Sequence, residues 1–194
     1  MAAITPLPLV LIVTGPPASG MTTLARRLAP MLGLPLLCKD TVKEVLFETL
    51  GWSDRVWSQR LGGASMELLY TFVETHLAVG ASCAVEANFA AQYATPAFRR
   101  LAERYAYLPI QVNCSADPAV LVERFRLRAL SGERHPGHHD VYTKPERTIV
   151  GRMKPLDIGG HVIDFDATCF QVDHDALAAR VRALWQQPAR RSEE

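Results

Sequence analysis

The chain has 194 residues, a length that suits one domain, and 48% of them are hydrophobic, which is enough for a full core. Its 21 basic and 20 acidic residues give a net charge of +1, so no bulk electrostatic attraction to nucleic acid or to a membrane surface is expected. No apolar run approaches the length of a membrane span, and the four cysteines lie far apart without CxxC spacing. We therefore expect a cytoplasmic protein with free thiols, monomeric or homodimeric, with no nucleic-acid or membrane partner.

Apolar runs and helical patterns alternate along the chain. Residues 7–14 are continuously apolar, as in a buried central strand, and residues 22–33 show helical spacing that stops at Gly33. The alternation predicts an α/β fold of three layers, with a mostly parallel five-stranded sheet and helices on both faces, in a single domain over residues 1–187 that is followed by a disordered tail. The other expected strand segments are 34–38, 82–89, 108–114, 161–165 and 169–173, and the other expected helices are 39–51, 64–80, 95–106, 117–132, 146–154 and 174–187.

Local signals set the expected ends of some of these elements. Thr41 and Glu44 have the spacing of a capping box at the start of the second helix. Pro96 is expected in the first turn of its helix, where a proline needs no backbone N–H group. Residues 51–63 are polar and bounded by glycines, so we expect an irregular segment there.

The segment GPPASGMTT, directly after the first strand, has the spacing of a phosphate-binding loop. Gly15, Gly20 and Thr22 stand where the Walker A pattern requires them, whereas the lysine position holds Met21. The backbone N–H groups of such a loop bind phosphate oxygens without any lysine side chain. We therefore predict a nucleotide site, and the alternative is a glycine turn that binds nothing. The predicted nucleotide-binding residues of the loop are Gly15, Pro16, Pro17, Ala18, Ser19, Gly20, Met21, Thr22 and Thr23.

Met21 changes the electrostatics of this predicted loop. Methionine has about the length of lysine and no branch, so it fills the same space and preserves the turn. It removes the cation that would follow the β- and γ-phosphates, and losing one such donor costs roughly 3–4 kcal/mol, or about 10²–10³ in rate. Whether Met21 is natural or an engineered substitution, it predicts an impaired enzyme.

The stretch GPPASGMTTLARRLAPMLGLPLLCKDTVKEVL resembles the start of the P-loop small-molecule kinases related to chloramphenicol phosphotransferase and zeta toxin, in the nucleoside-monophosphate-kinase-like group. The chain is also similar to bacterial AAA-family ATPase-like predicted kinases of this size. The resemblance extends over residues 7–185, and it implies ATP and Mg²⁺ as cofactors, a small-molecule hydroxyl acceptor and a mobile basic lid over about residues 128–147. That family has a lysine in the loop, so Met21 is a departure from its pattern.

Two acidic residues near the ends of strands are candidates for the chemistry. The resemblance places the acceptor-activating aspartate at Asp40, where a carboxylate near the γ-phosphate can orient a hydroxyl and take its proton; an N-cap role is the alternative. Glu86 resembles a Walker B acid that would hold Mg²⁺ together with Thr22. The alternatives for Glu86 are a place in an acceptor pocket, beside Asn88 and Phe89, or a role in helix capping or solvent contact.

The stretch ERFRLRALSGERHPGHHD, residues 123–140, is rich in basic side chains. The resemblance implies that lid arginines close over the triphosphate, so Arg128 and Arg134 are predicted to be catalytic and Arg124 to bind the nucleotide; a solvated basic helix face is the alternative. The histidines of this stretch favour a mobile lid over a zinc site, because their spacing is irregular. Lys39 and Lys144 are candidates to replace the missing loop cation.

Two functions of different classes are consistent with these patterns. The first is an ATP- and Mg²⁺-dependent phosphotransferase that acts on a hydroxyl of a small molecule and is impaired by Met21. The second is a nucleotide-binding sensor or scaffold that transfers no phosphate. A general ATPase motor is not expected, because the chain is short for such a module with its helical lid domain.

Overall fold

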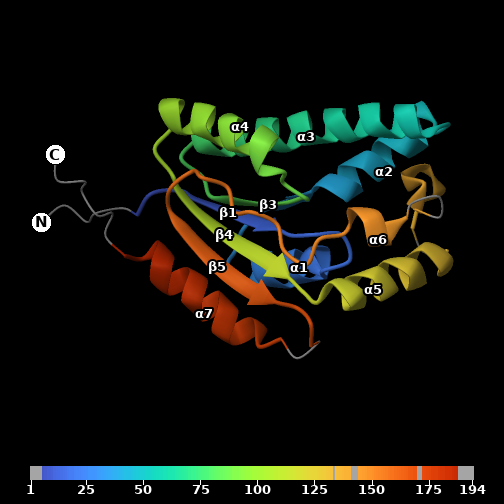
Figure 1. The fold of residues 1–194 in the computed structure, drawn as a ribbon. Helices are drawn as coiled ribbons and strands as arrows, with labels where there is room; N and C mark the ends of the chain where they lie inside the picture. Colours follow the sequence, from blue (N-terminus) through green and yellow to red (C-terminus); the bar gives the residue numbers. More distant parts are fainter. Residues whose placement is uncertain (1–5, 133, 141–143, 170–171, 188–194) are drawn as a thin grey trace, which may run out of the picture.

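A central sheet with helices on both faces forms the molecule (Figure 1). The computed structural model describes residues 6–132, 134–140, 144–169 and 172–187. The five strands lie in the order β2-β3-β1-β4-β5, and every neighbouring pair is parallel, which confirms the predicted α/β fold. The strands are Leu9–Thr14 (β1), Leu36–Cys38 (β2), Cys83–Glu86 (β3), Leu108–Ser115 (β4) and His161–Asp166 (β5).

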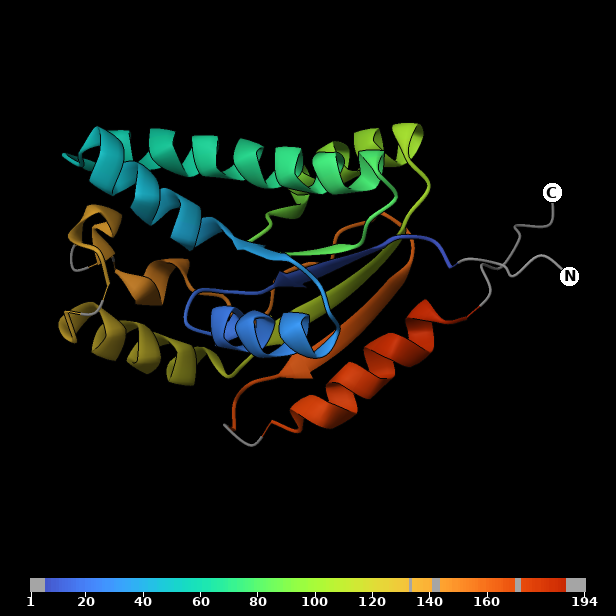
Figure 2. The ribbon, with the colours of Figure 1, turned by 180° about the vertical axis from the view of Figure 1, so that it is seen from behind.

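Helices connect consecutive strands, as parallel pairing requires. Figures 1 and 2 show α3 and α4 over one face of the sheet and α1 and α7 over the other, while α5 and α6 lie beyond one end of it. The helices are Met21–Met31 (α1), Lys39–Leu50 (α2), Arg55–Ala78 (α3), Ala91–Arg104 (α4), Pro118–Leu130 (α5), Pro145–Thr148 (α6) and His174–Trp185 (α7), and Pro136–His138 forms a 3₁₀ turn (η1).

The central strand β1 is buried on both sides, which explains its unbroken run of apolar residues. Alternate side chains of a strand point to opposite faces. Leu9, Leu11 and Val13 pack with α1 and α7, whereas Val10 and Ile12 pack with α3 and α4. One strand therefore contributes to both layers of the core.

The strand register positions the functional edge of the sheet. Val13 of β1 pairs with Glu86 of β3, which in turn pairs with Cys38 of β2. The segments that follow these three strands therefore start side by side at the carboxyl edge, which is where open parallel sheets bind ligands. All four cysteines are free thiols, as expected.

The largest departure from the sequence prediction concerns residues 51–63. The expected irregular segment is wrong from Arg55 onward, because α3 begins there. Asp54 caps this helix by accepting a hydrogen bond from the backbone N–H of Trp57 at 2.8 Å. Ser58 and Leu61 extend the buried stripe of α3 upstream, so packing keeps the helix continuous through its two glycines.

Several expected boundaries are also wrong. Thr41 does not cap α2, which begins two residues earlier straight from β2, and its hydroxyl instead accepts a hydrogen bond from Arg26 at 3.3 Å. Pro96 lies inside α4, because that helix begins at Ala91. The helix expected over 146–154 is shortened to Pro145–Thr148. In the expected strand 169–173, residues 169, 172 and 173 are not in a strand, and the others lie outside the described residues, as does the tail 188–194.

Candidate active site

The loop between β1 and α1 has the shape that a phosphate site requires. Ala18 and Gly20 have positive φ angles of 66° and 80°. A non-glycine residue at positive φ is uncommon, and such conformations cluster where a ligand is held. A Cβ added to Gly15 would lie 2.8 Å from atoms of Cys114, so only glycine fits there. Ser19 Oγ is buried and has no hydrogen-bond partner within the described part of the chain.

Met21 stands at the lysine position as the first residue of α1. Its side chain is 8% exposed and joins the core cluster of α1 and β1. The Met21 sulfur lies 3.8 Å from Nδ2 of Asn88, and the same nitrogen donates to the carbonyl of Gly15 at 2.7 Å. Methionine therefore fills this position without distorting the turn, and it presents no charge.

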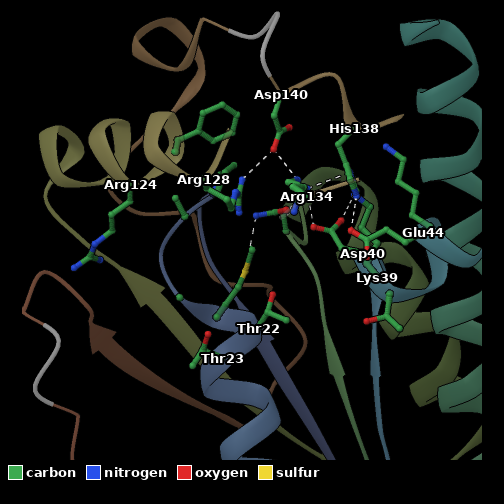
Figure 3. Close-up of a pocket in the computed structure, with 18 of the residues that line it drawn as sticks. Thr22, Thr23, Lys39, Asp40, Glu44, Arg124, Arg128, Arg134, His138 and Asp140 are labelled. Atoms are coloured by element: carbon green, nitrogen blue, oxygen red, sulfur yellow. Dashed lines mark hydrogen bonds and ion pairs between the residues drawn. The ribbon is translucent and has the colours of Figure 1, made fainter. Parts of the chain in front are cut away.

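A cavity of about 670 Å³ lies over the loop, within the range of small-molecule sites (Figure 3). Its walls come from the loop, the start of α2, α5 and residues 134–140, which belong to the lid predicted over about residues 128–147. Among the described residues, six basic side chains and three acidic ones line this cavity, an excess of positive charge that suits a polyanion. The loop supplies Pro17, Ala18, Gly20, Met21, Thr22 and Thr23, and the basic residues are Arg26, Lys39, Lys43, Arg124, Arg128 and Arg134.

Arg134 connects the lid to α2 (Figure 3). Its Nη2 lies 2.9 Å from Oδ2 of Asp40, and its Nε lies 2.6 Å from Oδ2 of Asp140. Arg128 approaches the same Asp140 oxygen at 3.4 Å. One carboxylate thus holds both predicted catalytic arginines over the loop.

Asp40 is an ionised carboxylate in this setting. Burial by itself would raise its pKa, but the charges of Arg134 and Lys39 outweigh burial and hold the pKa well below its usual range. Asp40 lies in the first turn of α2 and makes no capping hydrogen bond, so the N-cap alternative is wrong. Its carboxylate faces the cavity.

His138 supports Arg134 as a neutral group. Burial, followed by the charge of Arg134, lowers the pKa of His138 to about 3. Because arginine only donates, the contact of 3.1 Å between Arg134 and Nδ1 makes this ring nitrogen the acceptor. Nε2 then carries the proton and donates to Glu44 at 3.0 Å.

Glu86, at the end of β3, is only 3% exposed. Burial, and then the negative charge of Asp40, raises the pKa of Glu86 to about 7, against the opposing hydrogen bonds of the Cys38 thiol and the Thr22 hydroxyl. Its Oε2 is buried and lacks a hydrogen-bond partner among the residues described. A buried carboxylate oxygen beside a threonine hydroxyl, at the end of such a loop, is a suitable donor set for Mg²⁺.

Arg124 and Arg128 both line the cavity, and as residues four positions apart on α5 they share one face of the helix. Figure 3 shows Arg124 pointing away from the other arginines. Its guanidinium donates to the carbonyls of Ala167 and Thr168, in the segment after β5, at 2.8 and 3.0 Å. The Arg128 guanidinium lies 5.2 Å from the ring centre of Phe125. Arg128 therefore shares the Asp140 carboxylate with Arg134, whereas Arg124 is held by the segment after β5.

The lid histidines pack against α2. No group of three His, Cys, Asp or Glu residues is arranged to hold a metal ion in the described ranges. The ring of His135 stacks on Phe47 with 4.8 Å between centroids, and the carbonyl of Gly137 accepts from Ser58 at 2.7 Å. The lid is thus docked on α2 and α3 in this structure.

Lys43, which the sequence analysis did not single out, lines the same cavity. The available signal was its position three residues after Asp40 on one helix, because i and i+3 side chains share a face. Asn88 lines the cavity as expected, whereas Phe89 is fully buried and does not. Trp52 packs against the predicted lid, with 5.8 Å between its ring centre and that of His135, and it is 48% exposed.

Comparison with known proteins places this fold in a family, because a model of the AAA domain matches residues 10–143. The chain belongs to this AAA domain family. A crystal structure from Chloroflexus aurantiacus J-10-fl, described as a "putative kinase", is 41% identical in sequence to this chain, and the two structures have a TM-score of 0.85. The match covers 93% of this chain and 100% of that one. The family and this match support a P-loop kinase fold.

Two more distant structures are similar to this chain in their fold only. A sugar kinase from Janibacter sp. HTCC2649 is 14% identical with a TM-score of 0.54, and the match covers 93% of this chain and 94% of that one. The APS kinase of Mycobacterium tuberculosis, solved with AMPPNP and APS, is 15% identical with a TM-score of 0.57, over 94% of this chain and 100% of that one. A comparison with curated proteins finds no match. Within the described residues, no helix has the length and apolarity to cross a membrane.

Proposed function

We propose that this AAA domain is an ATP- and Mg²⁺-dependent phosphotransferase that acts on a hydroxyl of a small molecule. The observation that carries the proposal is the convergence of the loop, the Asp40 carboxylate and the arginine pair Arg128 and Arg134 on one basic cavity. Phosphoryl transfer depends on positioning and on charge stabilisation, and little covalent chemistry is left to the protein. This cavity offers both.

The loop and its neighbours hold the nucleotide in this proposal. Backbone N–H groups of residues 15–23 bind the phosphates. Thr22 and Glu86 would hold Mg²⁺, which neutralises phosphate charge when it is bound. Arg124 lines the cavity and donates hydrogen bonds to the segment after β5, and in this proposal the base binds beside that segment.

Lys39 takes over part of the role of the missing lysine. It lines the same cavity as Met21, and its single ion-pair partner among the described residues is Asp40, at 3.7 Å. Lys144, the other candidate, is exposed and does not line the cavity. A lysine side chain is flexible enough to leave a contact of 3.7 Å for a phosphate oxygen.

Asp40 orients the acceptor hydroxyl and takes its proton. In the structure the Arg134 guanidinium forms an ion pair with this carboxylate. A triphosphate competes for the same guanidinium, because arginine binds phosphate through paired, charge-assisted hydrogen bonds. Transfer of Arg134 to the phosphate raises the pKa of Asp40 and leaves its oxygen available to the hydroxyl.

Turnover tests the proposal. ADP release is measured with Mg-ATP and a panel of polyols, sugars, nucleosides and hydroxy acids, for this chain and for Met21→Lys, with Met21→Leu as the apolar control. We expect Met21→Lys to exceed both other chains by about 10²–10³ with at least one acceptor. If Met21→Lys binds ATP but releases no more ADP with any acceptor than without one, the kinase proposal fails.

A sensor or scaffold that binds nucleotide without transfer is the second candidate. Met21 is the observation that favours it, because an apolar side chain at the lysine position leaves binding by the backbone intact and weakens catalysis. Equal binding of Mg-ATP by this chain and Met21→Lys, without acceptor-dependent turnover in either, supports this candidate. Absence of nucleotide binding in both chains excludes both functions.

A further inference from the structure

A second cavity, of about 500 Å³, opens beside the first, and residues of α3 and α4 line most of it. The two cavities share Lys39, Lys43 and Asn88. A ligand in the second cavity would therefore lie next to one bound over the loop. Apart from Lys39, the residues given nucleotide roles above do not line the second cavity.

Lys43 stands where the two cavities meet. Its side chain is buried, and burial, followed by the charge of Lys39, lowers the pKa of Lys43 to about 8. Its Nζ donates to Oγ of Ser58 at 2.9 Å and lies 5.2 Å from the ring centre of Phe47. In the described part of the chain, no carboxylate lies within ion-pair distance of Lys43. The carboxylates of Asp40 and Asp140 attract this amine only from beyond ion-pair distance and do not offset its burial. An anionic ligand in direct contact would relieve that penalty.

The helix α3 carries two adjacent glycines, and therefore no side chains, at the positions that line the cavity near this amine. Gly62 and Gly63 are adjacent inside the helix, where each is less stable than alanine, and both line the cavity. A Cβ on Gly62 would lie 3.8 Å from Nζ of Lys43, and one on Gly63 would meet no atom within 4 Å. The pair therefore leaves open space beside the amine, as is found where backbone and ligand approach closely.

The remaining wall of the second cavity is aromatic and basic. Tyr70 and Tyr93 supply rings, and Met66 supplies a flexible apolar side chain. Arg100 adds a cation, and within the described ranges Glu67 is the single acidic residue that lines this cavity. The wall suits a small ligand with an apolar part and a negative charge.

We propose that the second cavity binds the phosphoryl acceptor, and that this acceptor is an anion: a hydroxyl compound that also carries a carboxylate or a phosphate group. The anionic group lies on Lys43 beside Gly62 and Gly63, and the hydroxyl points past Asn88 into the first cavity. The inference rests on the proposed function. In the transfer step the hydroxyl oxygen bonds to the γ-phosphorus, the bond to the β–γ bridging oxygen breaks, ADP leaves with that electron pair, and the hydroxyl proton passes to Asp40.

Binding of matched probe pairs tests this inference. The pairs are gluconate with glucose and glycerol 3-phosphate with glycerol, with inorganic phosphate as a bare anion, all titrated into the full chain with Mg²⁺ and β,γ-imido ATP already bound. We expect at least one anionic member to bind ten or more times tighter than its neutral partner. A preference for gluconate over glucose indicates a carboxylate acceptor, and a preference for glycerol 3-phosphate over glycerol indicates a phosphate acceptor. Lys43→Met should abolish the preference, Lys43→Arg should retain it, and Gly63→Leu should weaken binding of both members by filling the cavity. Arg180→Met removes one exposed cation from α7 and should change nothing.

Failure of the inference is separable from failure of the proposed function. If the chain binds no β,γ-imido ATP, the proposed function fails first. If the nucleotide binds and neutral probes bind as well as anions, only the inference is overturned. It is also overturned if Lys43→Met keeps the preference, or if gluconate, glycerol 3-phosphate and inorganic phosphate all fail to bind.

Discussion

Arg134 of the lid lies 2.9 Å from Asp40 of α2, so the predicted charge-stabilising residue is paired with the predicted acceptor-activating residue. The pair keeps the pKa of Asp40 low and docks the lid. A phosphate that draws Arg134 away changes both properties at once. The pair therefore links nucleotide binding to the availability of the base.

Replacing Arg134 with methionine should release this link. Without the guanidinium, burial dominates and the pKa of Asp40 rises, which carboxyl NMR titration would detect. A group with a depressed pKa stabilises the fold fully above its unfolded pKa of about 3.8 and loses that contribution as the pH falls through the folded value. The variant should therefore be less stable by about 1.5–3 kcal/mol at neutral pH, and this difference should shrink progressively as the pH falls below 3.8.

The control for this prediction is Arg126→Met. Arg126 is an exposed arginine on α5 that pairs with Glu146 outside the cavity. Its loss should change neither the pKa of Asp40 nor the stability by more than about 0.5 kcal/mol. An unchanged Asp40 pKa in Arg134→Met would contradict the link.

Lys39 and Met21 should be coupled in nucleotide binding. We expect Lys39→Met to weaken Mg-ATP binding by about tenfold, since it removes the flexible lysine that lines the cavity beside the loop. In the Met21→Lys background the same change should cost less, because the restored lysine neutralises the same phosphates. A double-mutant cycle of dissociation constants measures this coupling, and strictly additive effects would refute the surrogate role of Lys39.

The Glu86 carboxylate should lower the stability of the metal-free protein and contribute to Mg²⁺ binding. Its folded pKa of about 7 lies above the unfolded value of 4.5, so the native state binds more protons between these pH values and stability falls as the pH rises through that window. Glu86→Gln should remove this slope and stabilise the metal-free protein by about 3 kcal/mol at pH 8. The same variant should weaken Mg²⁺-dependent nucleotide binding.

Urea unfolding at several pH values, without Mg²⁺, measures the slope. Titration of Mg²⁺ in the presence of ATP measures the second effect. Asp164→Gln, at an exposed carboxylate of β5, serves as the control and should change neither quantity by much. Glu86→Gln with wild-type Mg²⁺ affinity would remove Glu86 from the metal site.

Two glycines should respond to alanine in opposite directions. In Gly15→Ala the new Cβ would meet Cys114 at 2.8 Å, so we expect a loss of about 1–3 kcal/mol and a distorted phosphate loop. In Gly63→Ala the Cβ meets open space within a helix, so we expect a gain of about 0.5–1 kcal/mol. Thermal unfolding of both variants provides the comparison, and a stabilising Gly15→Ala would contradict the close packing of the loop on β4.

The fold was predictable because its signals are local and periodic. The apolar run of β1 and the alternation of strand and helix patterns after it predicted the parallel α/β architecture, which is confirmed. Residues 55–63 were not predictable in this way, because their helix is stabilised by contacts of Ser58 and Leu61 that only the tertiary structure supplies. The glycine pair in that segment was a misleading signal, since packing tolerates it.

The sequence predicted which residues line the site better than it predicted the contacts between them. The sequence named Asp40, Arg128 and Arg134, and the structure brings them to one cavity, while their roles stay predictions. The direct pairing of Arg134 with Asp40 joins residues 94 positions apart, and no local pattern indicates it. The family-level resemblance is confirmed, and the closer relation to chloramphenicol phosphotransferase and zeta toxin stays a prediction.

The most direct test of the central claim is a calorimetric titration of this chain with ATP in the presence of Mg²⁺, beside Met21→Lys and Met21→Leu. We predict saturable one-to-one binding to all three, about 10 to 100 times tighter for Met21→Lys and unchanged for Met21→Leu. If no ATP binds to this chain or to Met21→Lys, the cavity over residues 15–23 is not a nucleotide site, and the account is wrong.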